Sequence, residues 1–152
     1  MKLAEALIRR ADAQKRIEQL RHRLNRNAKV QEGDQPAEDP KALLNELEQA
    51  TTQLTRLIQQ INRTNAATEF DSELTLSDAL AVRDILKLKH SIYSSLATEA
   101  TVTLSRYTKS EVKFYGTVEV AAIQQEANEL ARAHRELDTK IQEANWRVEL
   151  ME

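Results

Sequence analysis

Apolar side chains recur at alternating spacings of four and three residues through long stretches of this chain. In one stretch they fall at Leu43, Leu47, Ala50, Leu54, Leu57 and Ile61. This spacing collects them on one face of an α-helix, whereas a half-buried strand needs an apolar residue at every second position. The 152 residues include only two glycines and two prolines, too few for the many tight turns of an all-β fold. The sequence therefore predicts an all-α protein.

The periodic stretches predict about four long amphipathic helices. Their expected bounds are about 2–28, 40–64, 76–104 and 119–150. Gly33 and Pro36 interrupt the first connection, and Asp39 before Pro40 is typical of an N-cap followed by the first helical residue. Long helices joined by short connections pair as antiparallel hairpins. We therefore expect a single helical domain, 1–152, in which two hairpins form a bundle with coiled-coil-like seams.

Two segments interrupt the helical period. The second predicted helix ends in a polar run, where we expect Asn65 to close the helix in a left-handed conformation. Near 106–118 the helical spacing is lost, and Val112 and Phe114 alternate with polar residues before Gly116. A period of two is typical of extended chain. The sequence therefore predicts a short irregular or extended segment near 106–118.

The third predicted helix is apolar on two faces. One stripe comprises Leu76, Ala79, Leu80, Leu86, Tyr93, Ala97, Ala100 and Leu104. The other comprises Val82, Ile85, Leu88, Ile92 and Leu96. A helix with two apolar faces has neighbours on two sides. We therefore expect this helix at the centre of the assembly.

The sequence indicates no catalytic chemistry. The chain has no cysteine, which excludes disulfides, thiolate metal sites and cysteine catalysis. It has neither a glycine-rich phosphate loop nor a Gly-x-Ser-x-Gly motif. Its histidines, His22, His90 and His134, lie on three different predicted helices and none has a partner at the spacing of a helical metal pair. We expect no enzyme, no metal site and no cofactor.

Polar side chains at apolar positions mark a candidate pocket. Arg83 and His90 are seven residues apart on the first stripe of the third helix, and Asp84 adjoins them. A buried arginine usually pairs with a carboxylate or a carbonyl, so a structural ion pair is the favoured interpretation and a pocket the alternative. Donors at the end of the second helix could complete the pocket. Its candidate residues are Asn62, Arg63, Asn65, Arg83, Asp84 and His90.

The last predicted helix carries a seam that runs its whole length. The candidate oligomer seam comprises Ile123, Leu130, His134, Leu137, Ile141, Trp146 and Val148. At 1.5 Å per residue this helix is about 50 Å long, so we expect it to overhang its partner and to expose the seam. A monomer rarely exposes such a stripe, which favours a homo-oligomer. The alternative is that segment 106–120 folds back and covers the seam within one chain.

Charge is distributed unevenly along the chain. Residues 1–30 carry nine Lys and Arg against three Asp and Glu, whereas residues 31–50 carry one against six. A basic helix is typical of binding to nucleic acid or an anionic membrane surface. However, acids are spaced among these arginines and no aromatic interleaving is present, so we favour ion pairs within the protein and expect no tight nucleic-acid binding.

Four segments together resemble one family of small bacterial helical proteins. They are Leu3-x-Glu5-Ala6-Leu7-x-x-Arg10-Ala11-Asp12, the connection 30–40, Ile61-Asn62-Arg63-Thr64-Asn65 and Ile141-Gln142-x-x-Asn145-Trp146. Members are named septicolysin or have no assigned function, and the resemblance covers nearly the whole chain. The name implies a cytolysin, but the sequence shows neither an export signal nor an apolar run of transmembrane length. We expect a cytoplasmic structural or interaction protein that forms a helical homo-oligomer.

Overall fold

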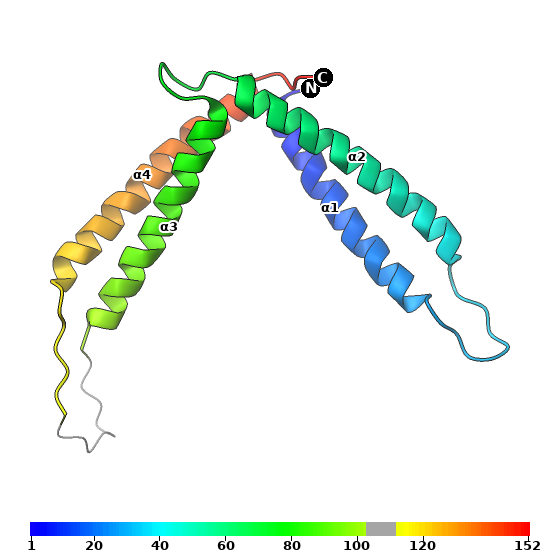
Figure 1. Ribbon diagram of the computed structural model, residues 1–152, viewed down its shortest axis with the longest axis horizontal. Helices are drawn as coiled ribbons and strands as arrows, with labels where there is room; N and C mark the ends of the chain where they lie inside the picture. Colours follow the sequence, from blue (N-terminus) through cyan, green and yellow to red (C-terminus); the bar gives the residue numbers. More distant parts are fainter. Residues whose placement is uncertain (103–111) are drawn as a thin grey trace. The chain divides into compact units, whose positions relative to one another are not determined.

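A computed structural model describes residues 1–102 and 112–152 of the chain. Its α-helices are α1 (Leu3–Arg26), α2 (Pro40–Ala67), α3 (Leu76–Ala100) and α4 (Val120–Arg147) (Figure 1). Within the described residues, β-type pairing is confined to two isolated bridges, Lys2 with Glu149 and Glu69 with Thr75. The prediction of an all-α protein with four long helices is confirmed.

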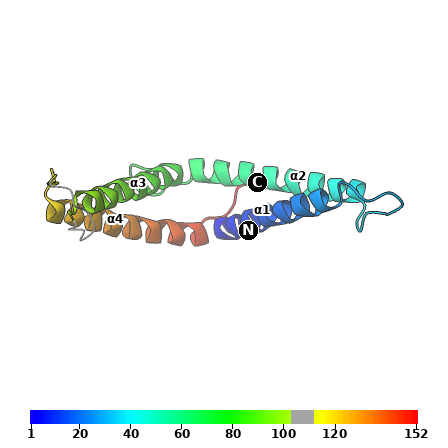
Figure 2. The ribbon, with the colours of Figure 1, turned by 90° about the horizontal axis from the view of Figure 1, so that it is seen from below.

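The chain divides into two compact units. The first comprises Met1–Thr75 and Glu143–Glu152, and the second comprises Leu76–Gln142. Each contains one helical hairpin, so the predicted pairing of neighbouring helices is confirmed (Figures 1 and 2). The sequence predicted one domain over 1–152, and that grouping of the two hairpins stays a prediction.

In the first unit, α1 and α2 lie side by side because their apolar faces share one core (Figure 2). The core contains Leu20, Leu43 and Ala50, which are almost fully buried, and partly buried Ile17, Leu24 and Leu47 pack against it. The start of α2 is as predicted. The Asp39 carboxylate accepts the backbone N–H of Lys41 at 3.1 Å, and Pro40 occupies the first helical position.

The prediction that Asn65 ends α2 in a left-handed conformation is wrong. The helix continues to Ala67 and is followed by Thr68, whose backbone is extended. Threonine hydroxyls support this last turn, because Thr68 Oγ1 donates to the Thr64 carbonyl at 2.7 Å and Thr64 Oγ1 donates to the Gln60 carbonyl at 2.8 Å. In the described residues positive φ is confined to glycine, at Gly33 in the first connection.

The last helix ends three residues before its predicted bound of 150. After Arg147 the backbone leaves the helix and pairs with the start of the chain: the Leu3 N–H donates to the Val148 carbonyl at 2.9 Å. The backbone N–H of Met151 then donates to Thr64 Oγ1, again at 2.9 Å. These hydrogen bonds tie the first residues, the end of α2 and the last residues of the first unit together. Because they join residues that are far apart in the sequence, no local sequence pattern predicts them.

In the second unit, α3 lies beside α4 (Figures 1 and 2). The inward faces bury Leu76, Ala79 and Ala97 of α3 and Ala127 and Leu130 of α4. The first predicted stripe of the third helix therefore faces inward, except Leu104, which lies outside the described residues.

The segment that precedes α4 is irregular where it is described. Residues 112–119 form neither helix nor strand, as the sequence predicted for the part of 106–118 that they cover. The remainder of the predicted segment lies outside the described residues. Gly116 passes so close to α3 that a Cβ atom there would lie 2.9 Å from the Ala100 carbonyl oxygen. A side chain at this position would force the segment away from the helix, which accounts for the glycine.

Candidate functional site

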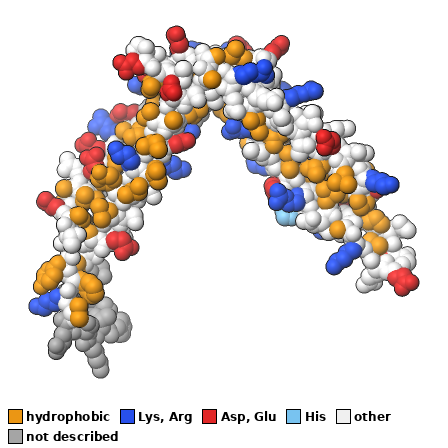
Figure 3. Space-filling view, in the orientation of Figure 1, with side chains coloured by type: hydrophobic (Ala, Val, Ile, Leu, Met, Phe, Trp, Pro, Cys, Tyr) orange, Lys and Arg blue, Asp and Glu red, His pale blue; other side chains and the backbone are white. Residues whose placement is uncertain are grey.

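The second stripe of α3 is exposed. Its side chains keep large fractions of their surface in water: Val82 43%, Ile85 54%, Leu88 54%, Ile92 55% and Leu96 40%. The space-filling view shows hydrophobic side chains on the surface of the hairpin formed by α3 and α4 (Figure 3). We call these five residues the outer stripe. The sequence predicted neighbours on two sides of this helix, and the described residues of the second unit cover only one side.

The outer stripe is long enough to be an interaction surface. Val82 and Leu96 are fourteen residues apart, which is about 21 Å along a helix. Five large side chains that are each about half exposed present apolar surface on the order of 400 Å². Contiguous apolar patches of this size on soluble proteins commonly mark binding sites, whereas single exposed leucines do not.

A hollow continues the outer stripe beyond the end of α3. Its volume is about 430 Å³. It is lined by Leu96, Ala100, Val102, Phe114, Tyr115 and Gly116, among others. Val102 is 51% exposed, so apolar surface extends past the last turn of the helix. Leu96 belongs to both the stripe and the hollow, which makes the two surfaces continuous.

Two unpaired charges flank this apolar surface. Lys89 and Glu99 are exposed on α3, and neither forms an ion pair within the described residues. Lys89 also lines a shallow apolar depression with Val82 and Ile85, so its aliphatic stem lies along the stripe.

The seam predicted for assembly on the last helix is mostly covered within one chain. Ile141 is fully buried and Leu130 is 6% exposed, while Ile123, His134, Leu137 and Val148 are partly buried. Trp146 alone remains largely exposed, at 56%. The expectation that the last helix exposes this seam along its whole length is wrong, because every seam residue other than Trp146 is buried or partly buried. Oligomer formation itself stays a prediction, and the larger exposed apolar surface lies on α3.

The predicted polar pocket is divided between the two units. In the second unit, Arg83 Nη1 donates to Asp138 Oδ1 at 2.9 Å, and Arg83 Nε lies 3.6 Å from Asp84 Oδ1. His90 has a different partner, since its Nε2 lies 3.3 Å from Ser94 Oγ. Arg83 thus forms the structural ion pair that the sequence favoured, and its partner is the carboxylate of Asp138.

The other three pocket residues belong to the first unit. Asn62 and Arg63 are exposed on α2, and Asn65 is partly buried in the same helix. Whether any of these six residues lines a pocket stays a prediction. Asp138 was missed because it is 55 residues from Arg83, and only the pairing register of α3 with α4 brings the two together.

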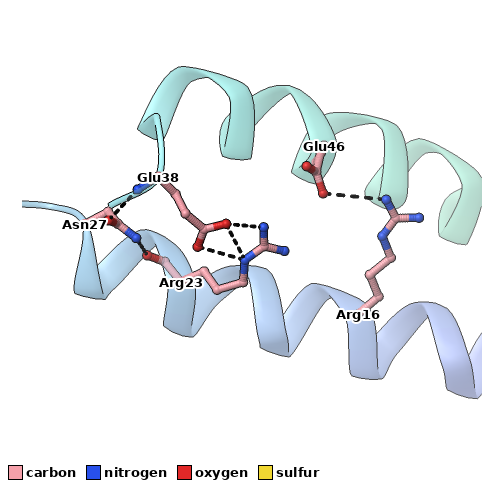
Figure 4. Close-up of polar contacts among 5 residues, drawn as sticks. All are labelled: Arg16, Arg23, Asn27, Glu38 and Glu46. Atoms are coloured by element: carbon pink, nitrogen blue, oxygen red, sulfur yellow. Dashed lines mark hydrogen bonds and ion pairs between the residues drawn. The ribbon is translucent and has the colours of Figure 1, made fainter. Parts of the chain in front are cut away.

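Arginines of the basic first helix pair with acids of the same unit. Arg23 Nε donates to Glu38 Oε2 at 3.0 Å, and Asn27 Oδ1 accepts the backbone N–H of Glu38 at 3.1 Å (Figure 4). Arg16 lies 3.6 Å from Glu46 of α2. The hydrogen bond from Arg23 holds the pKa of Glu38 below its ordinary value, and the same bond raises the pKa of Arg23. This cluster anchors the connection between α1 and α2.

Two kinds of site have no support among the described residues. Nowhere in them do three or more His, Cys, Asp or Glu side chains gather as a metal ion would require. None of the described helices is long and apolar enough to span a bilayer.

Comparison with known proteins shows a family without an assigned activity. Residues 10–150 match the family of unknown function DUF6847. A crystal structure of a functionally unknown conserved protein from Corynebacterium diphtheriae is 48% identical and superimposes with a TM-score of 0.94, covering 99% of both chains. No curated protein matches the chain. These similarities establish the fold and the family, and they leave the septicolysin resemblance as a prediction.

Proposed function

We propose that this chain, which belongs to the family of unknown function DUF6847, is a structural or interaction protein that assembles with copies of itself through the outer stripe of α3. It performs no catalysis in this proposal. A cytoplasmic location, the absence of tight nucleic-acid binding and the absence of lytic activity are part of the same proposal.

The observation that carries the proposal is the exposure of the outer stripe on a two-helix hairpin. Two paired helices can cover one apolar face each, and α3 has two. Completely burying a large aliphatic side chain contributes about 1.5–3 kcal/mol. Covering the exposed half of each stripe residue would therefore contribute on the order of 1 kcal/mol per residue. Five such residues on each copy supply a substantial driving force for association.

Binding of an anionic partner through α1 is the weaker candidate. Arg16 and Arg23 pair with carboxylates of the same unit, and Arg21 lies 3.1 Å from Glu18 on its own helix. A phosphate would have to compete with these carboxylates for each guanidinium. Fewer positive charges of residues 1–30 are therefore free to bind an anionic partner than the count of Lys and Arg indicates.

The test compares the mass in solution of the intact chain with the masses of two variants, by size-exclusion chromatography with light scattering. Ile85→Glu places a carboxylate in the outer stripe, and Leu44→Glu places one on α2 at nearly the same exposure, 53% against 54%. We expect an oligomer for the intact chain and for Leu44→Glu, and a monomer for Ile85→Glu. A monomeric intact chain, or equal assembly of both variants, would refute the proposal. Circular dichroism verifies that both variants remain helical.

A further inference from the structure

We infer that two copies pack α3 against α3 in antiparallel orientation, with a two-fold axis that crosses the contact between Leu88 and Lys89, and that the two Lys89 side chains at this axis limit the affinity. This inference rests on the proposed self-assembly and specifies which residues meet. It follows from the exposed face of α3, whose side chains are arranged nearly alike in both directions along the helix.

Three lines of exposed side chains run along this face. Residues seven apart lie on one line, because seven residues complete almost two turns of an α-helix. The centre line holds Ile85 and Ile92. One edge, which we call the lysine edge, holds Val82, Lys89 and Leu96. The other edge, which we call the leucine edge, holds Ala81, Leu88 and Ser95.

The centre line and the lysine edge are each symmetric about a midpoint between positions 88 and 89. Ile85 and Ile92 lie equally far from this midpoint, and they are 54% and 55% exposed. Val82 and Leu96 end the lysine edge on its two sides, and they are 43% and 40% exposed. Residues of similar size and exposure therefore occupy matching positions on both sides of the midpoint.

The leucine edge has the same symmetry. Leu88 lies at its middle and is 54% exposed, and the small residues Ala81 and Ser95 lie seven positions to either side of it. Small side chains at both ends let a second helix approach closely. The whole face is thus almost unchanged when the direction of the helix is reversed.

An antiparallel two-fold axis keeps each edge of the contact on its own side and reverses the order of residues along it. With the axis at the midpoint, Ile85 meets Ile92 of the second copy. On the lysine edge Val82 meets Leu96, and on the leucine edge the two Leu88 side chains meet each other. Every residue of the outer stripe is therefore covered by an apolar side chain.

A parallel two-fold axis would give a poorer match. It exchanges the two edges at the same height along the helix. Leu88 would then lie against Lys89 of the second copy, and Val82 and Leu96 would lie against the small residues of the leucine edge. The antiparallel arrangement is favoured because it pairs large apolar side chains with one another.

The antiparallel axis also brings the two Lys89 side chains together on the lysine edge. Lys89 forms no ion pair within the described residues, so no carboxylate of its own chain offsets the repulsion. Like charges directly opposite each other oppose association, and salt screens them. We therefore expect the dimer to tighten when salt is added.

The area of the contact is that of a weak dimer. The outer stripe presents on the order of 400 Å² on each copy, and the aliphatic stem of Lys89 and the small residues of the leucine edge add to it. Counted on both copies, the contact buries on the order of 1,000 Å², which is the lower end of the range for specific interfaces.

Single cysteines test the axis directly, because the intact chain has none. A disulfide needs Cα atoms within about 7 Å. Leu88→Cys alone should give a covalent dimer under mild oxidation, measured by non-reducing electrophoresis. Ile85→Cys and Ile92→Cys should each stay uncrosslinked alone, since the two copies of each position lie about 10 Å apart along the helix, and should crosslink when mixed. Leu44→Cys, equally exposed on α2, is the matched control.

The lysine pair gives a second measurement that requires no oxidation. We expect Lys89→Gln to lower the dissociation constant of the dimer about threefold at low salt, and to remove most of its dependence on salt between about 0.05 and 0.5 M. Lys87→Gln is the control, because Lys87 is exposed on the same helix and lies outside the three lines. Equal effects of the two variants would contradict the meeting of the lysines at the axis.

The outcomes of the crosslinking separate this inference from the proposed function. Crosslinking of Leu88→Cys alone and of the Ile85→Cys and Ile92→Cys mixture supports the axis. Self-crosslinking of Ile85→Cys and of Ile92→Cys would indicate a parallel pair and overturn the inference. Crosslinking of Leu88→Cys only when it is mixed with Ile92→Cys would indicate a shifted axis and overturn it too. An oligomer that Ile85→Glu dissociates but that none of these cysteines crosslinks would also overturn it, while self-assembly through α3 would stand. A monomeric intact chain would overturn both.

Discussion

Replacing Leu20 by alanine tests the core of the hairpin formed by α1 and α2. Leu20 is fully buried, and Leu43 and Ala50 belong to the same core cluster. Truncation removes three carbon atoms from an apolar environment and leaves a cavity, and such changes destabilise proteins by about 2–5 kcal/mol. Partly buried Ile17 and Leu24 can relax into the space, so we expect about 3 kcal/mol.

Urea unfolding followed by circular dichroism at 222 nm measures this loss. In a chain of this size each kcal/mol lost from the free energy of unfolding lowers the thermal midpoint by about 2–4 °C. In thermal unfolding we therefore expect the midpoint to fall by about 6–12 °C. Leu44→Ala is the control, because Leu44 is 53% exposed and truncation there should cost less than about 1 kcal/mol. Equal losses for the two variants would show that Leu20 is not a core residue and would refute the packing of the hairpin.

Three further outcomes are expected. The pKa of Glu38 is lower in the folded protein than in the unfolded chain, so its pair with Arg23 stabilises the fold above the unfolded-state pKa of Glu38, and this stabilisation is lost as the pH falls through the folded-state pKa. Glu38→Gln should therefore flatten the decline in stability between about pH 6 and 3, measured by thermal unfolding. Thr64→Val should cost about 1–2 kcal/mol relative to Thr64→Ser, because the Met151 N–H loses its acceptor; equal stability of the two variants would contradict this role. Fluorescence anisotropy with labelled DNA should show no sub-micromolar affinity at physiological salt.

The helices could be predicted because each depends on a local pattern. The spacing from Leu43 to Ile61 defines the buried face of α2 without reference to any other part of the chain. The cap at Asp39 depends only on its own neighbours in sequence. The predicted end of the last helix was wrong because residues far away in the sequence determine it. Helix α4 ends at Arg147, since the following backbone pairs with the start of the chain.

The candidate site was harder to predict because periodicity shows that a helix has an apolar stripe without showing what covers it. The seam containing Leu130 and Ile141 and the outer stripe containing Ile85 and Ile92 both have large apolar residues at helical spacing. Only the structure shows that most of the seam is covered within one chain and that the stripe is exposed. The surface proposed for assembly therefore moves from the last helix to α3.

Sedimentation equilibrium of the intact chain over a dilution series is the most direct test of self-assembly. We expect a mass at least twice the 17.4 kDa of one chain at about 10–100 µM, with dissociation toward one chain on dilution. A mass of 17.4 kDa at every concentration in that range would contradict the central claim.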